Sequence, residues 1–144
     1  MNGKRVPQVV AVATPHLSEG EQVELATFAK VGSVSVKRKV ATTAAVAAVT
    51  GGLLVVSVSA RSMYIAMTGR RLLFFDGHTA SGRPDAKLLM SIPRELVRVA
   101  DSKKGMLTLK VELAIDGQDK GLQLMFPKPC VEDGGQVIAA LQHP

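Results

Sequence analysis

Basic side chains flank one long uncharged segment of the chain, with a spacing suited to anion binding. The candidate anion- or lipid-binding residues are Lys30, Lys37, Arg38, Lys39, Arg70 and Arg71. Three adjacent cations beside an apolar stretch suit a phosphorylated ligand or an anionic membrane surface, where each cation contributes about 1 kcal/mol. The alternative interpretation is a charged cap on a helix, with the arginines merely solvating a turn.

The sequence contains no group of side chains with the spacing of a catalytic or metal site. His16, His78 and His143 are far apart, and none is spaced with a cysteine or carboxylate as metal ligands are. Phosphate-binding loops and hydrolase motifs are absent. Cys130 is the single cysteine, which excludes an internal disulfide and favours an ordinary thiol. We therefore expect no enzyme activity, no cofactor and no metal.

The excess positive charge is confined to the first half of the chain. The 144 residues carry a net charge of +6; residues 1–71 hold nine basic and three acidic residues, and residues 72–144 hold nine of each. Such a one-sided field attracts phosphates. Aromatic residues make up only 3%, which disfavours a nucleic acid as partner.

No secretion signal is evident, so we expect a cytoplasmic protein, peripheral at the inner membrane if it binds lipid.

Hydrophobic periodicity predicts a mainly β domain. Residues 106–116 alternate without a defect, with Leu107 on the same apolar face as the later leucines. Gly69-Arg70 is expected to form a tight hairpin turn in which the glycine has a positive φ. The expected strands are residues 22–36 (one or two strands, broken near Gly32), 64–68, 72–75, 87–92, 96–100, 106–116 and 122–126, and the expected final helix is 131–142.

These elements predict a strongly bent antiparallel sheet, or partial barrel, of about seven strands closed by the C-terminal helix. Residues 1–16 contain Pro7 and Pro15 and are expected to form a flexible arm. The domain would then cover residues 17–144, with an insertion over 37–61.

The uncharged residues 40–60 allow two interpretations. Their length is that of a membrane span, about 20 residues. Their composition is rich in alanine and threonine, however, and Gly51-Gly52 lies in the middle. We favour an Ala-rich helix near 38–52 that the glycines end, followed by a short apolar strand.

Two motifs resemble those of the bacterial pleckstrin-homology-like domains, which are related to the GRAM domains. The first is Leu17-Ser18-Glu19-Gly20-Glu21, and the second is MYIAMTGRRLLFFDG over 63–77, in which Gly69 replaces the usual Asp or Asn. Residues 82–84 and 91–95 are similar to the downstream pattern of actinobacterial members. The resemblance implies a non-enzymatic binding module, with basic residues between its first two strands that hold an anionic lipid, or with a protein partner.

The same resemblance constrains the uncharged segment. In such a fold the first strand pairs with strands that follow residue 62, so one membrane span between them would separate the partners. Two alternative functions stay open: a single-span or monotopic membrane protein that uses residues 40–60, and a basic nucleic-acid-binding protein.

Overall fold

The computed structural model describes residues 3, 5–35, 60–77, 82–116, 118 and 120–142, and its chain forms seven strands and two α-helices there. The Ala-rich helix expected near 38–52 lies outside these residues. The elements are α1 (Arg5–Ala13), β1 (Val23–Ser35), β2 (Arg61–Thr68), β3 (Arg71–Gly77), β4 (Pro84–Pro93), β5 (Val97–Lys104), β6 (Leu109–Ile115), β7 (Lys120–Phe126) and α3 (Val131–Gln142), with short 3-10 turns at Thr14–His16, Arg94–Leu96 and Lys128–Cys130.

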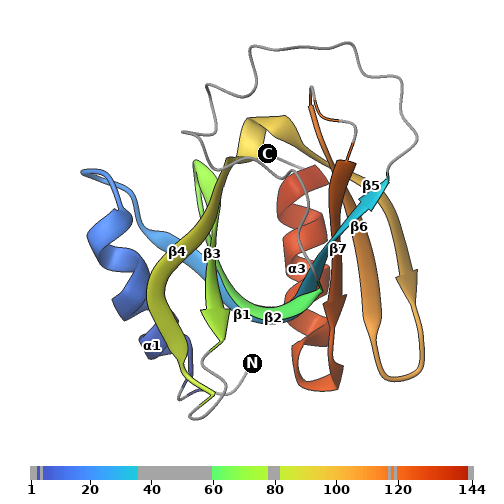
Figure 1. Ribbon diagram of the computed structural model, residues 1–144, viewed down its shortest axis with the longest axis horizontal. Coiled ribbons are helices and arrows are strands. Elements are labelled where there is room, and N and C mark those ends of the chain that lie inside the picture. The colour runs from blue at the N-terminus through green and yellow to red at the C-terminus, as the bar shows by residue number, and fades with distance from the viewer. Residues whose placement is uncertain are drawn as a thin grey trace.

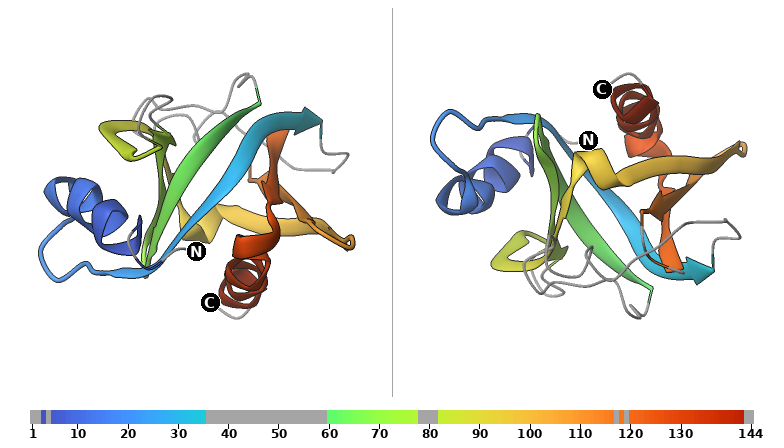
Figure 2. Two further views of the ribbon diagram at one scale, coloured as in Figure 1. Left: turned by 90° about the horizontal axis from the view of Figure 1, so that it is seen from below. Right: turned by 90° about the horizontal axis from the view of Figure 1, so that it is seen from above.

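All seven strands belong to one antiparallel sheet with the order β4-β3-β2-β1-β7-β6-β5. β1 is the joint of this sheet: its first part, Val23–Val31, pairs with β2, and its last part, Lys30–Ser35, pairs with β7. Figures 1 and 2 show the sheet bending strongly along this joint. The prediction that residues 22–36 pair with strands beyond Arg61 is confirmed, as are the antiparallel strands and the final helix.

The main core lies between the sheet and α3. Alternate residues of β6, namely Leu109, Val111, Leu113 and Ile115, are all buried there. α3 contributes Val137 and Leu141, which are four residues apart and therefore lie on one helix face.

A second, smaller core explains the N-terminal residues. Residues 5–13 form α1 instead of the expected flexible arm, and Val9 and Ala13 are fully buried against Ala26, Leu73 and Phe75 on the other face of the sheet. Val9 and Ala13 are one helical turn apart, and Pro7 lies in the first turn, where a missing N–H costs nothing. The sequence pattern did not predict α1, because its apolar stripe is short and has only two buried positions.

Three local predictions need correction. β1 is not broken at Gly32; a Cβ there would lie 3.3 Å from Cα of Ala60, so the glycine permits close approach of the chain. Gly69 does not have a positive φ, which among the described glycines occurs at Gly20 and Gly82. β6 begins at Leu109, and Leu107 is exposed rather than part of the apolar face.

Candidate functional site

The predicted basic residues that the structure describes, Lys30, Arg70 and Arg71, do not come together in one site. Lys37, Arg38 and Lys39 lie outside the described residues. Lys30 is exposed on β1 opposite Ser62, whereas Arg70 is exposed in the turn that follows the other end of β2. The strand between them spans about 20 Å at 3.3 Å per residue. Lys30 and Arg70 therefore belong to different parts of the surface.

Arg71 lies in a structural ion pair. Its Nη2 donates to Glu21 Oε1 at 2.9 Å and its Nε donates to Glu21 Oε2 at 3.1 Å. The Glu21 side chain is only 1% exposed. The hydrogen bond from Arg71 lowers the pKa of Glu21 to about 2, against the opposing effect of burial and with further help from the Ser18 N–H and the Thr68 hydroxyl.

This ion pair brings together the two motifs that carry the family resemblance. Thr68 Oγ1 donates to Glu21 Oε2 at 2.6 Å, and the Ser18 N–H donates to Glu21 Oε1 at 2.9 Å. Arg71 Nη2 also donates to the carbonyl of His16. The motif residues thus hold the turn before β1 against the β2–β3 hairpin, so their presence is explained by their contribution to the stability of the fold.

A different group of cations gathers at the free end of the β5–β6 hairpin. We call it the hairpin cluster, and it consists of the exposed lysines Lys103, Lys104, Lys110 and Lys128. Lys103 lies directly opposite Lys110, and Lys104 lies opposite Leu109 in the last pair of the hairpin. Lys104 and Lys128 line the same groove of about 580 Å³ beside the start of α3, and the exposed carboxylate of Glu132 lines it with them. Among the described residues, none of these lysines forms an ion pair.

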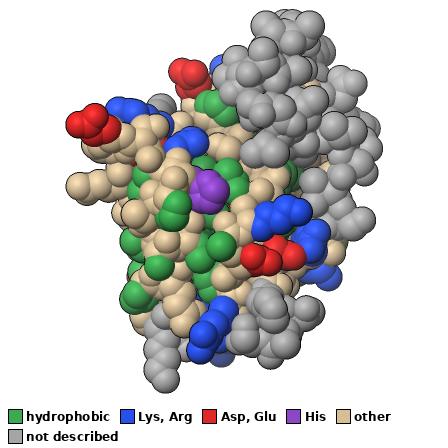
Figure 3. Space-filling model, turned by 60° about the vertical axis from the view of Figure 1, so that its left-hand side comes forward, with side chains coloured by type: hydrophobic (Ala, Val, Ile, Leu, Met, Phe, Trp, Pro, Cys, Tyr) green, Lys and Arg blue, Asp and Glu red, His purple; other side chains and the backbone are tan. Residues whose placement is uncertain are grey.

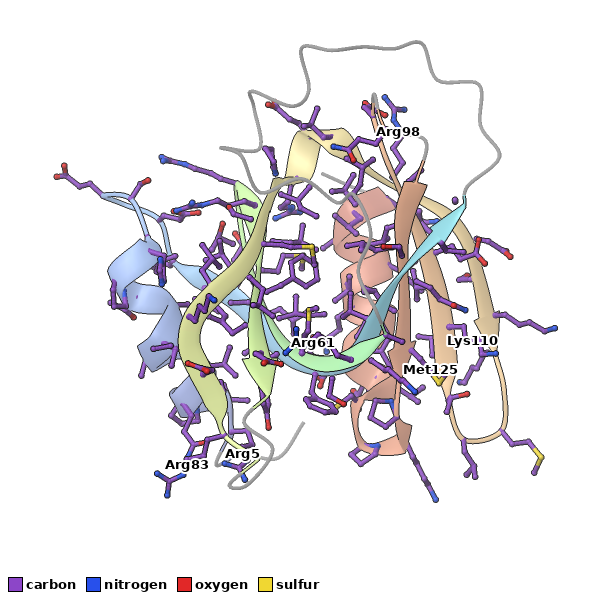
Figure 4. The ribbon with its side chains drawn as sticks, in the orientation of Figure 1. Arg5, Arg61, Arg83, Arg98, Lys110 and Met125 are labelled. Atoms are coloured by element: carbon purple, nitrogen blue, oxygen red, sulfur yellow. The ribbon has the colours of Figure 1, made fainter. Side chains whose placement is uncertain are left out.

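The hairpin cluster continues as a row across the sheet. Lys110 pairs with Met125 on β7, and Met125 pairs with Lys30 on β1, so these side chains share one face. Figure 4 shows Lys110 and Met125 on neighbouring strands at this side of the molecule. Neighbouring strands are about 4.8 Å apart, which places Lys30 about 10 Å from Lys110. Lys30 is thus a predicted site residue that the fold joins to a basic surface.

Acidic residues lie behind this row rather than within it. Asp101 and Glu112 are opposite each other and two residues further from the hairpin end than Lys103 and Lys110. The hairpin therefore carries positive charge at its end and negative charge behind it. On the side of α1 and β4, by contrast, basic and acidic side chains lie next to one another (Figure 3).

The turn at the end of the hairpin exposes two large apolar side chains. Met106 is 98% exposed and Leu107 is 60% exposed. The Gly105 N–H donates to the Thr108 carbonyl at 2.8 Å, which closes the turn around them. The other exposed large apolar side chains in the described part of the chain are Val6 and Val10 on α1, each 36% exposed.

The described residues contain no group of three or more His, Cys, Asp or Glu side chains that could hold a metal ion. No protein-family model matches this chain, and no curated protein is significantly similar to it. The described part of the chain includes no helix that is both long and apolar enough to cross a bilayer.

Sequence reasoning missed the hairpin cluster because it counted charge along the chain. The four lysines lie in the half whose charges cancel, and only the hairpin register and the path of β7 bring them together, with Glu132 as an acidic neighbour of Lys104 and Lys128 in the groove. The available signal was Lys103-Lys104-Gly105, which precedes Met106 and Leu107 in a turn: two cations next to two apolar residues that a hairpin end would expose.

Proposed function

We propose that this chain is a non-enzymatic binding domain of the pleckstrin-homology-like type that docks on an anionic membrane surface. Its sheet order, the joint strand β1 and the C-terminal helix agree with the architecture that the sequence resemblance implies. The contacts between Glu21, Thr68 and Arg71 support the same resemblance, because they give the two motifs a common structural purpose.

The hairpin cluster is the observation that carries the membrane proposal. Four exposed lysines surround one projecting end of the molecule, and no carboxylate of the described residues pairs with them. Each cation near an anionic bilayer contributes about 1 kcal/mol, so the cluster supplies about 4 kcal/mol before screening. Asp101 and Glu112 behind the cluster favour an approach with the hairpin end first.

The alternative functions have less support. A single span over residues 40–60 conflicts with the pairing of Val31 with Arg61, which holds both flanks of that segment in one sheet. Base stacking on a nucleic acid needs exposed aromatic rings, and every described phenylalanine and tyrosine is buried or partly buried. If the chain binds neither kind of vesicle in the experiment below, a protein partner with an acidic surface replaces the membrane as the explanation of the hairpin cluster.

Vesicle co-sedimentation tests the proposal. The chain should bind phosphatidylglycerol vesicles and should bind phosphatidylcholine vesicles far less. Its binding to phosphatidylglycerol should weaken as added salt shortens the Debye length from about 10 Å to about 3 Å. The variant K103Q/K104Q/K110Q/K128Q should lose binding to the anionic vesicles. Lys87→Gln, an exposed lysine on the opposite edge strand β4, is the matched control and should bind as the wild type does.

Equal binding to both kinds of vesicle, or undiminished binding by the four-lysine variant, would overturn the proposal. Because the proposed ligand is an anionic membrane surface, we propose that the protein acts as a peripheral protein at the cytoplasmic side of the inner membrane.

A further inference from the structure

The exposed apolar pair at the end of the β5–β6 hairpin has no function in the core. Met106 and Leu107 make up the projecting turn, whereas the next apolar residue, Leu109, is only 6% exposed and belongs to the main core. Two large apolar side chains held in water by an ordered turn are unfavourable for the free protein. Their position therefore points to a surface that covers them.

The charges around this pair indicate what kind of surface it is. Lys103 and Lys110 lie on one face of the hairpin, and Lys104 lies on the other, all within two residues of the turn. Cations thus flank the apolar end on both faces of the hairpin, and Glu132 is the one acidic residue among those that line the groove beside Lys104. A plane of negative charge above an apolar layer matches this arrangement, and that is the structure of an anionic bilayer.

Resting on the function proposed above, we infer that Met106 and Leu107 penetrate the interfacial layer of an anionic membrane while the hairpin cluster binds the headgroups. The lysine side chains are long enough to keep their ammonium groups at the phosphates while their stems follow the apolar residues inward. Methionine adapts its flexible side chain to disordered acyl chains. Binding then has a salt-sensitive part from the lysines and a salt-resistant part from the apolar pair.

The absence of tryptophan from the chain allows a direct test, because one introduced tryptophan reports alone. Leu107→Trp should show a blue-shifted emission on phosphatidylglycerol vesicles and should be quenched by brominated lipid. Gln142→Trp is the matched control: it is exposed at the far end of α3, which starts beside Lys104 and ends beside Arg94. Its emission should not change when vesicles are added.

A second variant measures the contribution of the apolar pair. M106S/L107S should bind phosphatidylglycerol vesicles at least tenfold more weakly and should lose the salt-resistant part, with an unchanged Tm because both side chains are exposed. If the wild type binds these vesicles but L107W shows neither shift nor quenching and M106S/L107S binds equally well, the insertion is wrong and the electrostatic proposal stands. If the wild type does not bind them at all, both proposals fail.

Discussion

Arg71 binds both carboxylate oxygens of Glu21, and this pair joins two segments that are 50 residues apart in the chain. The Arg71 side chain is 25% exposed, but that of Glu21 is only 1% exposed. A buried carboxylate is tolerated only when its partners replace water. Arg71, Thr68 and the Ser18 N–H supply those partners. The ion pair is therefore a condition for placing the turn before β1 against the β2–β3 hairpin.

Glu21→Gln should lower the free energy of unfolding by about 2–3 kcal/mol at neutral pH, because the ionised carboxylate of Glu21 is stabilised in the folded state. Its pKa falls from the ordinary value of 4.5 to about 2 on folding. The stabilisation is thus complete above pH 4.5 and is lost as the pH falls towards 2. Urea denaturation of both proteins should show their stability difference shrinking over that interval.

Arg71→Met is the complementary variant. It leaves a buried carboxylate without its cation, so it should destabilise the protein more than Glu21→Gln does at neutral pH, by about 3–5 kcal/mol. A stability difference between wild type and Glu21→Gln that stays constant down to the acid limit would contradict the assignment.

The fold was predictable where the sequence alternates and where turns are marked. The alternation of apolar and polar residues predicted β6 and β7, and the glycine after Thr68 predicted the β2–β3 hairpin. The family resemblance predicted that β1 pairs with strands beyond Arg61. α1 was missed because its apolar stripe has only two buried positions. Leu107 was wrongly placed on the apolar face because the alternation of apolar and polar residues starts at residue 106, before β6 itself begins at Leu109.

The site was less predictable than the fold because it depends on register. Lys103, Lys110 and Lys30 are separated along the chain, and only the pairing of β5, β6, β7 and β1 puts them in one row. Arg71 shows the converse: it was a candidate for ligand binding by charge alone, yet its guanidinium already binds Glu21.

Adjacent glycines at the start of α3 should respond in opposite directions to the same substitution. A Cβ on Gly134 would lie 2.6 Å from Cδ2 of Phe126 and 2.8 Å from Cδ2 of Leu109, so Gly134→Ala should destabilise the protein by about 1–3 kcal/mol. A Cβ on Gly135 would meet nothing within 4 Å, so Gly135→Ala should stabilise the helix by about 0.5–1 kcal/mol. Thermal unfolding of the two variants measures both effects; equal Tm changes would contradict the close packing of α3 on β6 and β7.

Arg94 should be needed to hold the end of α3 on the sheet. Its Nη1 donates to the Thr68 carbonyl at 2.8 Å and its Nη2 to the Ala140 carbonyl at 3.0 Å. Arg94→Lys keeps the charge but cannot make both bonds, so stability should fall by about 1–2 kcal/mol. Hydrogen exchange should become faster in the last turn of α3. Arg98→Gln is the control: its ion pair with Asp116 is exposed, and its loss should leave stability and exchange unchanged.

Lys110→Gln should raise stability and lower membrane binding at the same time. Lys103 and Lys110 are opposite each other on neighbouring strands, and like charges in this position repel by a few tenths of a kcal/mol. Removing one charge should therefore stabilise the protein slightly at low salt and have no effect at high salt, where the repulsion is screened. Binding to phosphatidylglycerol vesicles should weaken about fivefold, the equivalent of one headgroup contact.

Urea denaturation and co-sedimentation at two salt concentrations measure both changes, and the control variant Lys87→Gln should alter neither stability nor binding. If Lys110→Gln instead destabilises the protein at low salt, Lys110 has a favourable partner within the chain, and its place in the hairpin cluster is explained without a membrane.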